Sequence, residues 1–222
     1  MADTPTPTPR PTLLRLPQYH RVLKEMAREE GRKNVSCTQI AYRLRLEPTQ
    51  VRKDLAATGI VGRPRIGYDT ARLIEAIETF LGWKNTSDAF LIGAGNLGTA
   101  LMGYEGFREH GLNIVAAFDT DPEKIGAEIV GRPVFGLEKL PDLADRLHVK
   151  IAIITAPAEA ARQVAELAVV SGIRALWNFA PVYLDVPEDV VVEDVRLVAS
   201  LGALTGKLNQ RIRSEDFARE ST

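Results

Sequence analysis

The sequence predicts an α/β protein in two parts, a small domain of short helices followed by a larger domain built on a mostly parallel sheet. Helix-spaced apolar residues and turn signals fill residues 1–85, whereas apolar strands alternate with helical segments beyond them. The two parts also differ in charge. We expect a disordered tail over 1–14, a first domain over 15–85, a sheet domain over 86–200 and a C-terminal helix over 201–222.

Composition limits the possible classes of function. A chain of 222 residues with 45% hydrophobic content can bury a sizeable core. No apolar run approaches the ~20 residues that a membrane span needs, and the Thr-Pro repeat at the N-terminus lacks the apolar core of a signal peptide. The single Cys37 excludes an internal disulfide, and the three histidines lie far apart, so we expect a cytoplasmic protein without a metal site.

The charge is distributed unevenly between the two parts. Residues 1–85 hold fifteen Lys and Arg against nine Asp and Glu, whereas residues 86–222 hold thirteen against twenty. A basic first part on an acidic second part indicates a polyanion as the partner of the first part. An ordinary solvated surface would give the same counts, so charge alone leaves both interpretations open.

Helix signals follow one another through the first part. Apolar residues recur at helical spacing over 16–30, and Gly31 ends that helix. Ser36 suits the N-cap of a short helix through Leu44. A tight turn over 45–47 then precedes a third helix that begins at Pro48 and stops at Gly59. This is a helix-turn-helix pattern, although a small helical bundle that contacts protein would look similar.

The third helix carries the chemistry expected of a DNA reader. Val51 and Leu55 can anchor it to the core, which leaves polar residues on the other faces to pair with base edges or neutralise phosphate. The stretch 59–68, "GIVGRPRIGY", suits a basic hairpin that can reach the DNA backbone or a narrow minor groove. We therefore predict a winged helix-turn-helix. Its DNA-binding residues are expected to be Thr49, Gln50, Arg52, Lys53, Arg63 and Arg65.

A dinucleotide-type turn opens the second part. A linking helix is expected over 68–83, and the polar residues 84–87 mark the domain boundary. A strand over 88–92 then runs into a glycine-rich turn with a helix after it. In such a turn Gly93 permits a sharp bend, Gly95 removes a side chain where pyrophosphate approaches, and Gly98 lets helix and strand pack closely.

An acidic residue completes this pattern. Asp119 ends the next strand, over 113–119, and lies twenty-one residues beyond Gly98. A carboxylate there can accept hydrogen bonds from ribose hydroxyls and would repel a 2′-phosphate, which favours NAD(H) over NADP(H). The same fold with an empty or differently used pocket stays open.

The alternation continues to the end of the chain. Strands are expected over 149–158, 173–181 and 189–197, with a helix over 158–172. This pattern predicts a Rossmann-like, doubly wound parallel sheet with helices on both faces. The end of the first of these strands would face the predicted dinucleotide pocket. The last helix has few apolar anchors and would either dock on a partner subunit or fray.

The sequence favours a sensor over an enzyme. His110 and His148 are expected at helix ends, and no Ser/Lys/Tyr or His/Asp arrangement commits the chain to catalysis. A DNA reader joined to a nucleotide site suits a protein in which the ligand shifts an equilibrium between two domain arrangements. Two alternatives remain: an NAD-dependent oxidoreductase whose basic part binds protein, and a CoA- or nucleotide-binding regulatory subunit.

Several stretches between Leu16 and Leu208 resemble the Rex family of redox-sensing transcriptional repressors. They are "RLPQYHRVL", "VRKDLAATGIVGRPRIGY", "GAGNLGTAL", "YEGF", "AAFDTDPEKIG", "ITAPAEAARQVAE" and "WNFAPVYLDVPEDV". The resemblance implies a homodimer that binds an inverted-repeat operator in double-stranded DNA through two winged helices and exchanges its C-terminal helix between subunits. It also implies that NADH releases the DNA, whereas NAD+ competes with NADH and permits binding.

The resemblance also implies a set of ligand and switch residues. The glycine turn would hold the pyrophosphate, Asp119 the ribose, and the loop over 178–181 would lie near the nicotinamide with Tyr104. The implied cofactor-binding residues are Gly93, Ala94, Gly95, Asn96, Leu97, Gly98, Tyr104, Asp119, Lys124, Thr155, Ala156, Pro157, Asn178, Phe179 and Ala180. The switch would involve Arg21, Tyr104 and Arg196.

One position departs from the family pattern. The family carries an acidic residue in the last strand that pairs with an arginine matching Arg21, but Arg196 stands at that position here. Arg21 facing Arg196 would repel, so either Asp194 takes over or the switch differs, and we expect the NADH response to be weakened or rewired. A large NADH effect that Arg196→Asp leaves unchanged would refute this. Arg65 replaces a small residue of the family and adds a possible phosphate contact.

Overall fold

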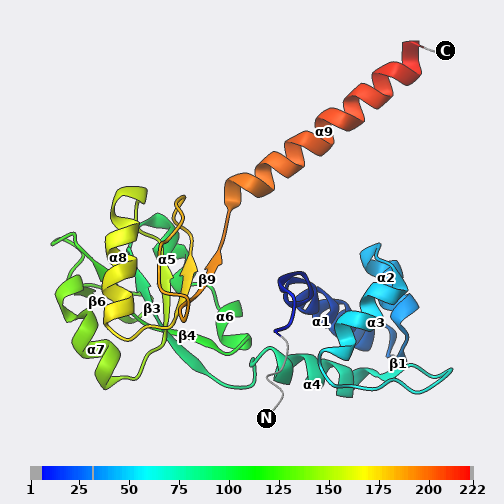
Figure 1. Cartoon of the computed structure of the whole chain (residues 1–222), viewed down its shortest axis with the longest axis horizontal. Helices are drawn as coiled ribbons and strands as arrows, with labels where there is room; N and C mark the ends of the chain where they lie inside the picture. Colours follow the sequence, from blue (N-terminus) through cyan, green and yellow to red (C-terminus); the bar gives the residue numbers. More distant parts are fainter. Residues whose placement is uncertain (1–6, 32, 221–222) are drawn as a thin grey trace. The chain divides into compact units, whose positions relative to one another are not determined.

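The computed structural model describes residues 7–31 and 33–220. The chain divides into two compact units. The N-terminal unit comprises Met1–Thr86 and Glu109–Gly111, and the sheet unit comprises Ser87–Arg108 and Leu112–Thr222. Figure 1 labels the elements of both units.

Three helices make up the body of the N-terminal unit. Helix α1 spans Arg10–Glu30, α2 spans Cys37–Leu44 and α3 spans Pro48–Ala56. The predicted signals at their ends are confirmed. Gly31 closes α1 in the left-handed region, and Ser36 caps α2 through a reciprocal capping box with Gln39. Arg45, also left-handed, begins the short turn that leads into Pro48 at the first position of α3.

The predicted hairpin follows α3. Strand β1 (Asn34–Val35) pairs antiparallel with β2 (Tyr68–Asp69), and an isolated bridge joins Arg63 to Gly67. Helix α4 (Thr70–Phe80) comes next and lies within the linking helix that the sequence predicts over 68–83. We call residues 60–67 the wing.

A buried carboxylate joins α3 to α1. Asp54 is 1% exposed, and it accepts hydrogen bonds from four side chains: Arg15 (2.6 and 2.9 Å), Tyr19 (2.6 Å), Thr12 (2.8 Å) and Gln50 (3.0 Å). Burial alone would raise the pKa of Asp54, but these four donors outweigh it and hold the pKa at about 2. The inward face of α3 is therefore fixed by an ionised group as well as by apolar packing.

The chain returns once to the N-terminal unit, through Glu109–Gly111. The His110 ring lies edge-on to Trp83 with centroids 4.3 Å apart, and His20 contacts the same indole at 5.1 Å. Gly111 has φ +74, and a Cβ there would come within 2.7 Å of the carbonyl oxygens of Trp83 and Asn85. Only glycine fits this close approach, so the segment is held tightly.

The sheet unit is built on a seven-stranded sheet in the order β5-β6-β4-β3-β7-β8-β9. Its strands are β3 (Ser87–Ile92), β4 (Leu112–Asp119), β5 (Glu128–Ile129), β6 (Arg132–Gly136), β7 (Ile151–Ile154), β8 (Ala175–Asn178) and β9 (Val191–Asp194). All pairs are parallel except β5–β6. The strand order reverses between β3 and β7, and ligands of open α/β sheets bind at such a reversal.

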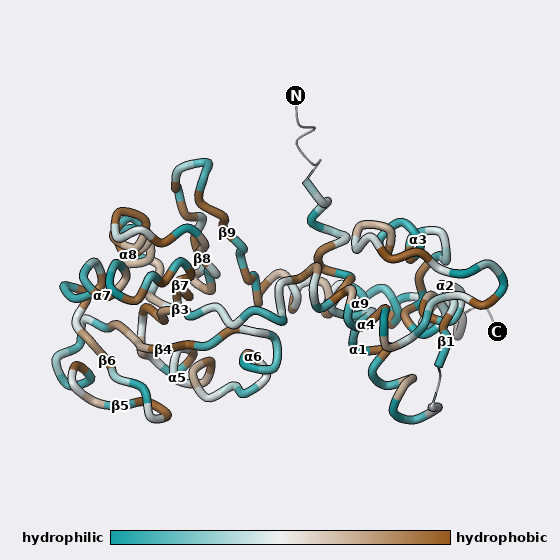
Figure 2. The backbone as a smooth tube through the Cα atoms, turned by 90° about the horizontal axis from the view of Figure 1, so that it is seen from below, coloured by the Kyte–Doolittle hydropathy of each residue, from teal (hydrophilic) through white to brown (hydrophobic). Residues whose placement is uncertain are grey.

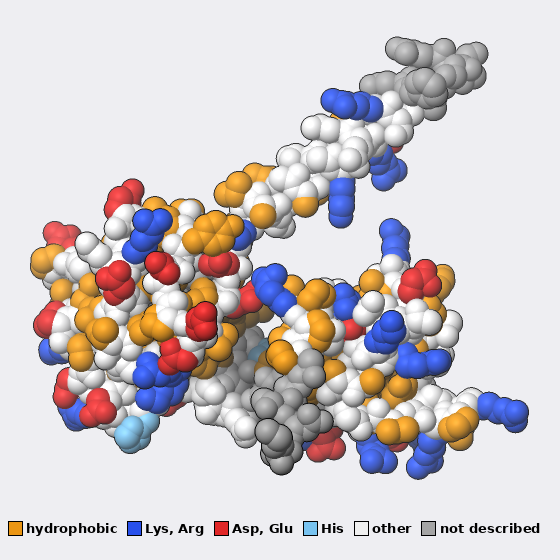
Figure 3. All heavy atoms as spheres, in the orientation of Figure 1, with side chains coloured by type: hydrophobic (Ala, Val, Ile, Leu, Met, Phe, Trp, Pro, Cys, Tyr) orange, Lys and Arg blue, Asp and Glu red, His pale blue; other side chains and the backbone are white. Residues whose placement is uncertain are grey.

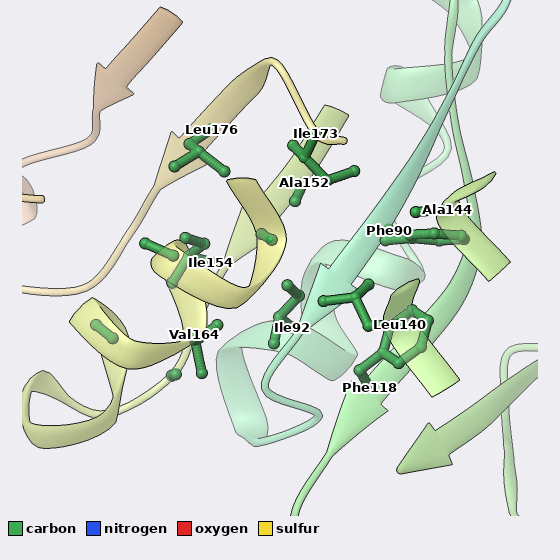
Figure 4. Close-up of a cluster of buried hydrophobic side chains, with 14 of the residues drawn as sticks. Phe90, Ile92, Phe118, Leu140, Ala144, Ala152, Ile154, Val164, Ile173 and Leu176 are labelled. Atoms are coloured by element: carbon green, nitrogen blue, oxygen red, sulfur yellow. The ribbon is translucent and has the colours of Figure 1, made fainter. Parts of the chain in front are cut away.

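Helices cover the sheet on both faces. They are α5 (Asn96–Met102), α6 (Gly106–Glu109), α7 (Leu140–Arg146) and α8 (Ala158–Val170), with a 3-10 turn over Leu137–Lys139. Phe90 and Ile92 of β3 point toward α7 and α8 (Figure 4), whereas Leu91 points to the opposite face with Met102 of α5. This alternation along apolar strands (Figure 2) accounts for their nearly continuous hydrophobic sequence.

Several predicted boundaries differ from the structure: α3 ends at Ala56 rather than at Gly59, and β7, β8 and β9 are shorter than the predicted strands. Helix α1 begins at Arg10, inside the predicted tail over 1–14, because the Thr12 hydroxyl reaches buried Asp54 and so anchors the first turn. Residues 1–6 of that tail lie outside the described residues. Helix α9 spans Leu197–Glu220 and so begins four residues earlier than predicted. The short strands β1, β5 and β6 were not predicted, whereas α7 ends close to His148, where a helix end was expected.

Replacing Asp54 by Asn should destabilise the protein by about 3 kcal/mol at pH 7, because it removes a buried charge that accepts hydrogen bonds from four side chains. The native-state pKa of Asp54 lies below the ordinary 3.8, so its contribution is present above pH 3.8 and is lost as the pH falls through about 2. The difference between wild type and variant, measured by urea unfolding, should therefore shrink at pH 2. Glu25→Gln, on exposed α1 surface, is the control and should change stability by less than ~0.5 kcal/mol.

Candidate functional site

The glycine turn has the geometry that the sequence predicts. Gly93 has φ +106, and a Cβ there would lie 2.8 Å from the backbone of Thr155 and Ala156. A Cβ on Gly98 would collide with the Gly93 carbonyl oxygen and meet Leu91 at 2.9 Å. At Gly95, by contrast, a Cβ would meet nothing within 4 Å. The first and third glycines thus serve packing, and the second leaves an open approach to the turn.

Asp119 lies beside this turn, at the carboxyl end of β4. One carboxylate oxygen accepts from the Ala94 N–H at 2.8 Å, and the other accepts from the N–H groups of Thr120 and Asp121 at 2.8 and 2.9 Å. Lys124 Nζ lies 3.4 Å from the same carboxylate. Burial opposes ionisation, but the N–H donors and the nearby Lys124 outweigh it and lower the pKa of Asp119. The site keeps a fixed negative charge.

The ends of β7 and β8 complete one edge of the sheet. The register places Ile92, Ile154, Asn178 and Asp194 side by side at the carboxyl ends of β3, β7, β8 and β9. The Thr155 hydroxyl donates to the Gly93 carbonyl at 2.7 Å. The sheet therefore brings together the ends of strands that lie far apart in sequence. Of the cofactor residues predicted after β7, Ala156 is buried and Pro157 is exposed at the start of α8.

The side chain of Asn178, a predicted cofactor residue, is engaged within the protein. It is fully buried, its amide nitrogen donates to Val182 O (2.9 Å) and Asp194 Oδ1 (2.7 Å), and its amide oxygen accepts from Ala180 N–H (3.0 Å). Both amide hydrogens are already engaged, so Asn178 shapes the following loop rather than offering donors to a ligand.

A row of aromatic rings connects Tyr104 to that loop. Tyr104 contacts Phe107 with centroids 4.8 Å apart, Phe107 contacts Trp177 at 5.2 Å, and Trp177 contacts Phe179 at 5.1 Å. The Tyr104 ring also covers Gly106, where a Cβ would meet it at 2.6 Å. Tyr104 itself is 59% exposed, so this row ends in an aromatic side chain open to a ligand or partner.

The outer face of α3 is polar and accessible. Val51 and Leu55 are fully buried, as predicted, whereas Thr49, Arg52 and Lys53 are exposed. Figure 3 shows Lys and Arg side chains gathered over the unit that contains α2 and α3. Gln50 departs from the expectation, because it is half-buried and its amide donates to Asp54 at 3.0 Å. Its amide nitrogen is thus held to its own helix.

A hollow of about 590 Å³ separates α3 from the wing. It is lined by the start of α2 (residues 36–38), by Arg52 and Ala56 of α3, and by residues 60–68. The wing turns at Pro64 and Arg65, with the Ile66 N–H bonded to the Arg63 carbonyl at 3.2 Å. Arg65 has φ +65, a conformation that favours glycine. The chain thus holds an exposed arginine at a strained tip, where a glycine would relax it.

Arg21 and Arg196, the predicted repelling pair, each have a partner of their own. Arg21 Nε lies 3.8 Å from Glu25 on the same helix, and Arg196 Nη2 lies 2.9 Å from Asp194 Oδ1. The positive charge of Arg196 is therefore neutralised locally. In these contacts Asp194 is the partner of Arg196, not of Arg21.

The described residues include neither a metal-binding cluster nor a helix suited to cross a membrane. In residues 7–31 and 33–220, no group of three or more His, Cys, Asp or Glu side chains is placed to hold a metal ion. None of the helices described there combines the length and apolar character required for a bilayer crossing.

A basic winged helix-turn-helix joined to a dinucleotide-type sheet defines the class of ligand-responsive transcription regulators. Family models match both parts: one described as "Putative DNA-binding protein N-terminus" covers residues 8–56, and one described as "CoA binding domain" covers residues 84–182.

Relatives identify the family. The chain is 47% identical to the redox-sensing transcriptional repressor Rex of Treponema denticola over 90% of this chain and 95% of that protein. It is 40% identical to the Rex of Bacteroides thetaiotaomicron over 92% of each. The chain belongs to the Rex family of redox-sensing transcriptional repressors. The predicted fold class and the prediction of a regulator rather than an enzyme are confirmed.

Solved structures of a relative agree over the full length. The crystal structure of RSP, a Rex-family repressor, in complex with β-NAD+ and operator DNA is 32% identical, with a TM-score of 0.87 and coverage of 98% of this chain and 100% of that one. RSP in complex with β-NADH gives a TM-score of 0.86, with 96% and 99% covered.

The glycine turn provides a test of its own. Gly98→Ala should destabilise the protein by about 1–3 kcal/mol, because the added methyl group meets the Gly93 carbonyl and forces backbone to move. Gly95→Leu has open space and an ordinary φ of −80°, so it should change stability by less than ~0.5 kcal/mol. Thermal unfolding of both variants measures the contrast, and equal losses would contradict the assigned roles.

Proposed function

We propose that this protein binds operator DNA through its N-terminal unit and releases it when NADH occupies the sheet unit, so that transcription follows the NADH/NAD+ ratio. The observation that carries the proposal is the presence, in one chain, of a basic winged helix and of a glycine turn with an ionised acid beside it. RSP, at 32% identity, was solved with NAD+ and operator DNA and also with NADH, which supports both ligands.

The proposed DNA interface uses the exposed side of α3 and the wing. Thr49, Arg52 and Lys53 would face the major groove, with Arg52 for base edges and Lys53 for phosphate. Arg63 and Arg65 would bring positive charge to the backbone or minor groove on the other side of the hollow. Gln50 is assigned to support α3 through Asp54 rather than to base recognition.

The proposed dinucleotide site uses the carboxyl edge of the sheet. The pyrophosphate would approach at exposed Gly95, Asn96 and Leu97, and Asp119 would accept hydrogen bonds from the adenosine ribose. The nicotinamide half would lie beyond the β3–β7 reversal, toward Thr155 and the loop after β8. Lys124 would fix the Asp119 carboxylate.

The proposed assembly is a homodimer through α9. Five of its apolar side chains are spaced four, three, four and four residues apart and are 46–65% exposed: Leu197, Leu201, Leu204, Leu208 and Ile212. The sequence analysis expected few apolar anchors, but these five share one helix face. An exposed apolar stripe on a 24-residue helix needs a cover, and a second copy with an exchanged helix supplies it. We place this function in the cytoplasm, with the DNA and the nicotinamide pool.

Titrating NADH into protein bound to a labelled operator tests the proposal. A duplex selected from a randomised pool should be released by NADH, and NAD+ should protect it, since only the reduced form should favour the DNA-free arrangement. Gly95→Leu should retain DNA binding but lose release, because its side chain fills the pyrophosphate approach. Equal DNA affinity with either nicotinamide would overturn the proposal. Tighter binding of CoA than of NADH, or hydride transfer to a small aldehyde, would favour the two alternative functions.

Two substitutions on α3 separate base recognition from charge. Arg52→Ala should cost about 1–3 kcal/mol of operator binding and relax sequence preference, whereas Lys53→Ala should lower the salt slope by about one without changing preference. NADH affinity should stay the same in both. Arg146→Ala, an exposed arginine on α7, is the matched control. Fluorescence anisotropy measures the binding of operator fragments at several salt concentrations. If Arg52→Ala binds the operator as wild type does, the assignment of α3 to the DNA interface is wrong.

A further inference from the structure

Arg196 occupies a junction between the candidate pocket and the C-terminal helix. It follows β9 by two residues and immediately precedes Leu197, the first residue of α9. Because β8 and β9 are parallel neighbours with Asn178 opposite Asp194, this junction lies at the same edge of the sheet as the loop after β8. Its side chain is about one quarter exposed.

The guanidinium of Arg196 holds that loop from several sides. Nη1 donates to the carbonyl oxygens of Ala180 (3.0 Å) and Val182 (3.1 Å), and Nη2 donates to Val182 (3.1 Å). Nη2 also lies 2.9 Å from Asp194 Oδ1, and the guanidinium carbon lies 4.5 Å from the centre of the Tyr183 ring. A planar group with five donors can make all of these contacts at once, whereas an ammonium cannot.

Asn178 closes the network. Its amide nitrogen donates to the same two acceptors that Arg196 uses, Val182 O and Asp194 Oδ1. The Val195 N–H also bonds the Asn178 carbonyl at 2.8 Å. The loop over 178–183 and the start of α9 are therefore tied to each other by side-chain and backbone contacts within a single subunit.

We propose that Arg196 is the positioning residue that couples the nicotinamide end of the pocket to α9, and thereby to the dimer and its grip on DNA. The inference rests on the proposed function and adds the contacts through which NADH binding would act on α9. A ligand that moves the loop after β8 must either carry the first turn of α9 with it or break the Arg196 contacts. This coupling does not depend on any contact between Arg196 and Arg21.

This assignment also gives a physical reason for an arginine at this position. The carbonyl oxygens of Ala180 and Val182 and the Asp194 carboxylate all direct negative charge at the Arg196 guanidinium. An acidic side chain at this position would therefore be repelled. Arginine instead satisfies these acceptors and stacks on Tyr183. The NADH response is thus rewired through contacts inside one subunit.

The test compares Arg196→Met with Arg146→Met in the full chain. The first change removes every donor but keeps much of the side-chain length, and the second makes the same change on the exposed surface of α7. NADH affinity is measured by its fluorescence, and operator affinity by anisotropy with and without saturating NADH. Wild type and Arg146→Met should lose operator affinity about tenfold or more with NADH.

Arg196→Met should reduce this NADH effect to less than about threefold, while NADH affinity and DNA affinity without NADH each stay within about threefold of wild type. A merely structural role would lower the melting temperature and both affinities together. An Arg196→Met variant with the full NADH effect would overturn the inference alone. A wild-type protein without any NADH effect would overturn the proposed function, and this inference with it.

A second pair of variants keeps the test decisive if Arg196→Met does not fold. Arg196→Lys retains the charge but cannot bridge both carbonyls and Asp194, so it should lose most of the NADH effect. Asp194→Asn should lose it as well, and the double variant should lose no more than either single one, because both act through one network. Additive losses, or a full effect in Arg196→Lys, would contradict the assignment.

Discussion

The close packing of α5 against the carboxyl end of β3 is the constraint on which the sheet unit depends. Gly98 admits no methyl group because the Gly93 carbonyl lies directly over it, and Gly93 itself lies against the backbone of Thr155. This contact joins β3 to β7 at the point where the strand order reverses. The same turn brings the Ala94 N–H to Asp119, so packing and the charge of the site are set together.

The two sides of α3 carry different kinds of charged residue. Asp54 faces inward, where four donors keep it ionised at 1% exposure, and Arg52 and Lys53 face outward without such ties. A buried carboxylate that accepts hydrogen bonds from four side chains fixes the orientation of a helix more sharply than apolar contacts alone, since hydrogen bonds are directional. A reading helix needs this fixed orientation if its outer side chains are to meet base edges in register.

Arg196, where the resemblance to the family implies an acidic residue, is accommodated by contacts within its own unit. An arginine at the end of β9 would be costly beside another arginine, but here it has Asp194, two loop carbonyls and the Tyr183 ring. The family relationship and the overall architecture are unaffected by this exchange. At the start of α9, Arg196 holds Asp194, the loop after β8 and Tyr183 together.

The sequence by itself determined the main helices, the strands β3, β4, β7, β8 and β9, the winged helix-turn-helix, the glycine turn and the acid after the second strand, because these depend on local periodicity, capping and spacing. It did not determine that α1 begins at Arg10, that Gln50 and Asn178 are engaged in buried networks, or that Arg196 is neutralised by Asp194. Each of these depends on side chains from distant elements meeting across a sheet edge or a helix pair. Local sequence carries no signal for such contacts, so only the tertiary structure decided them.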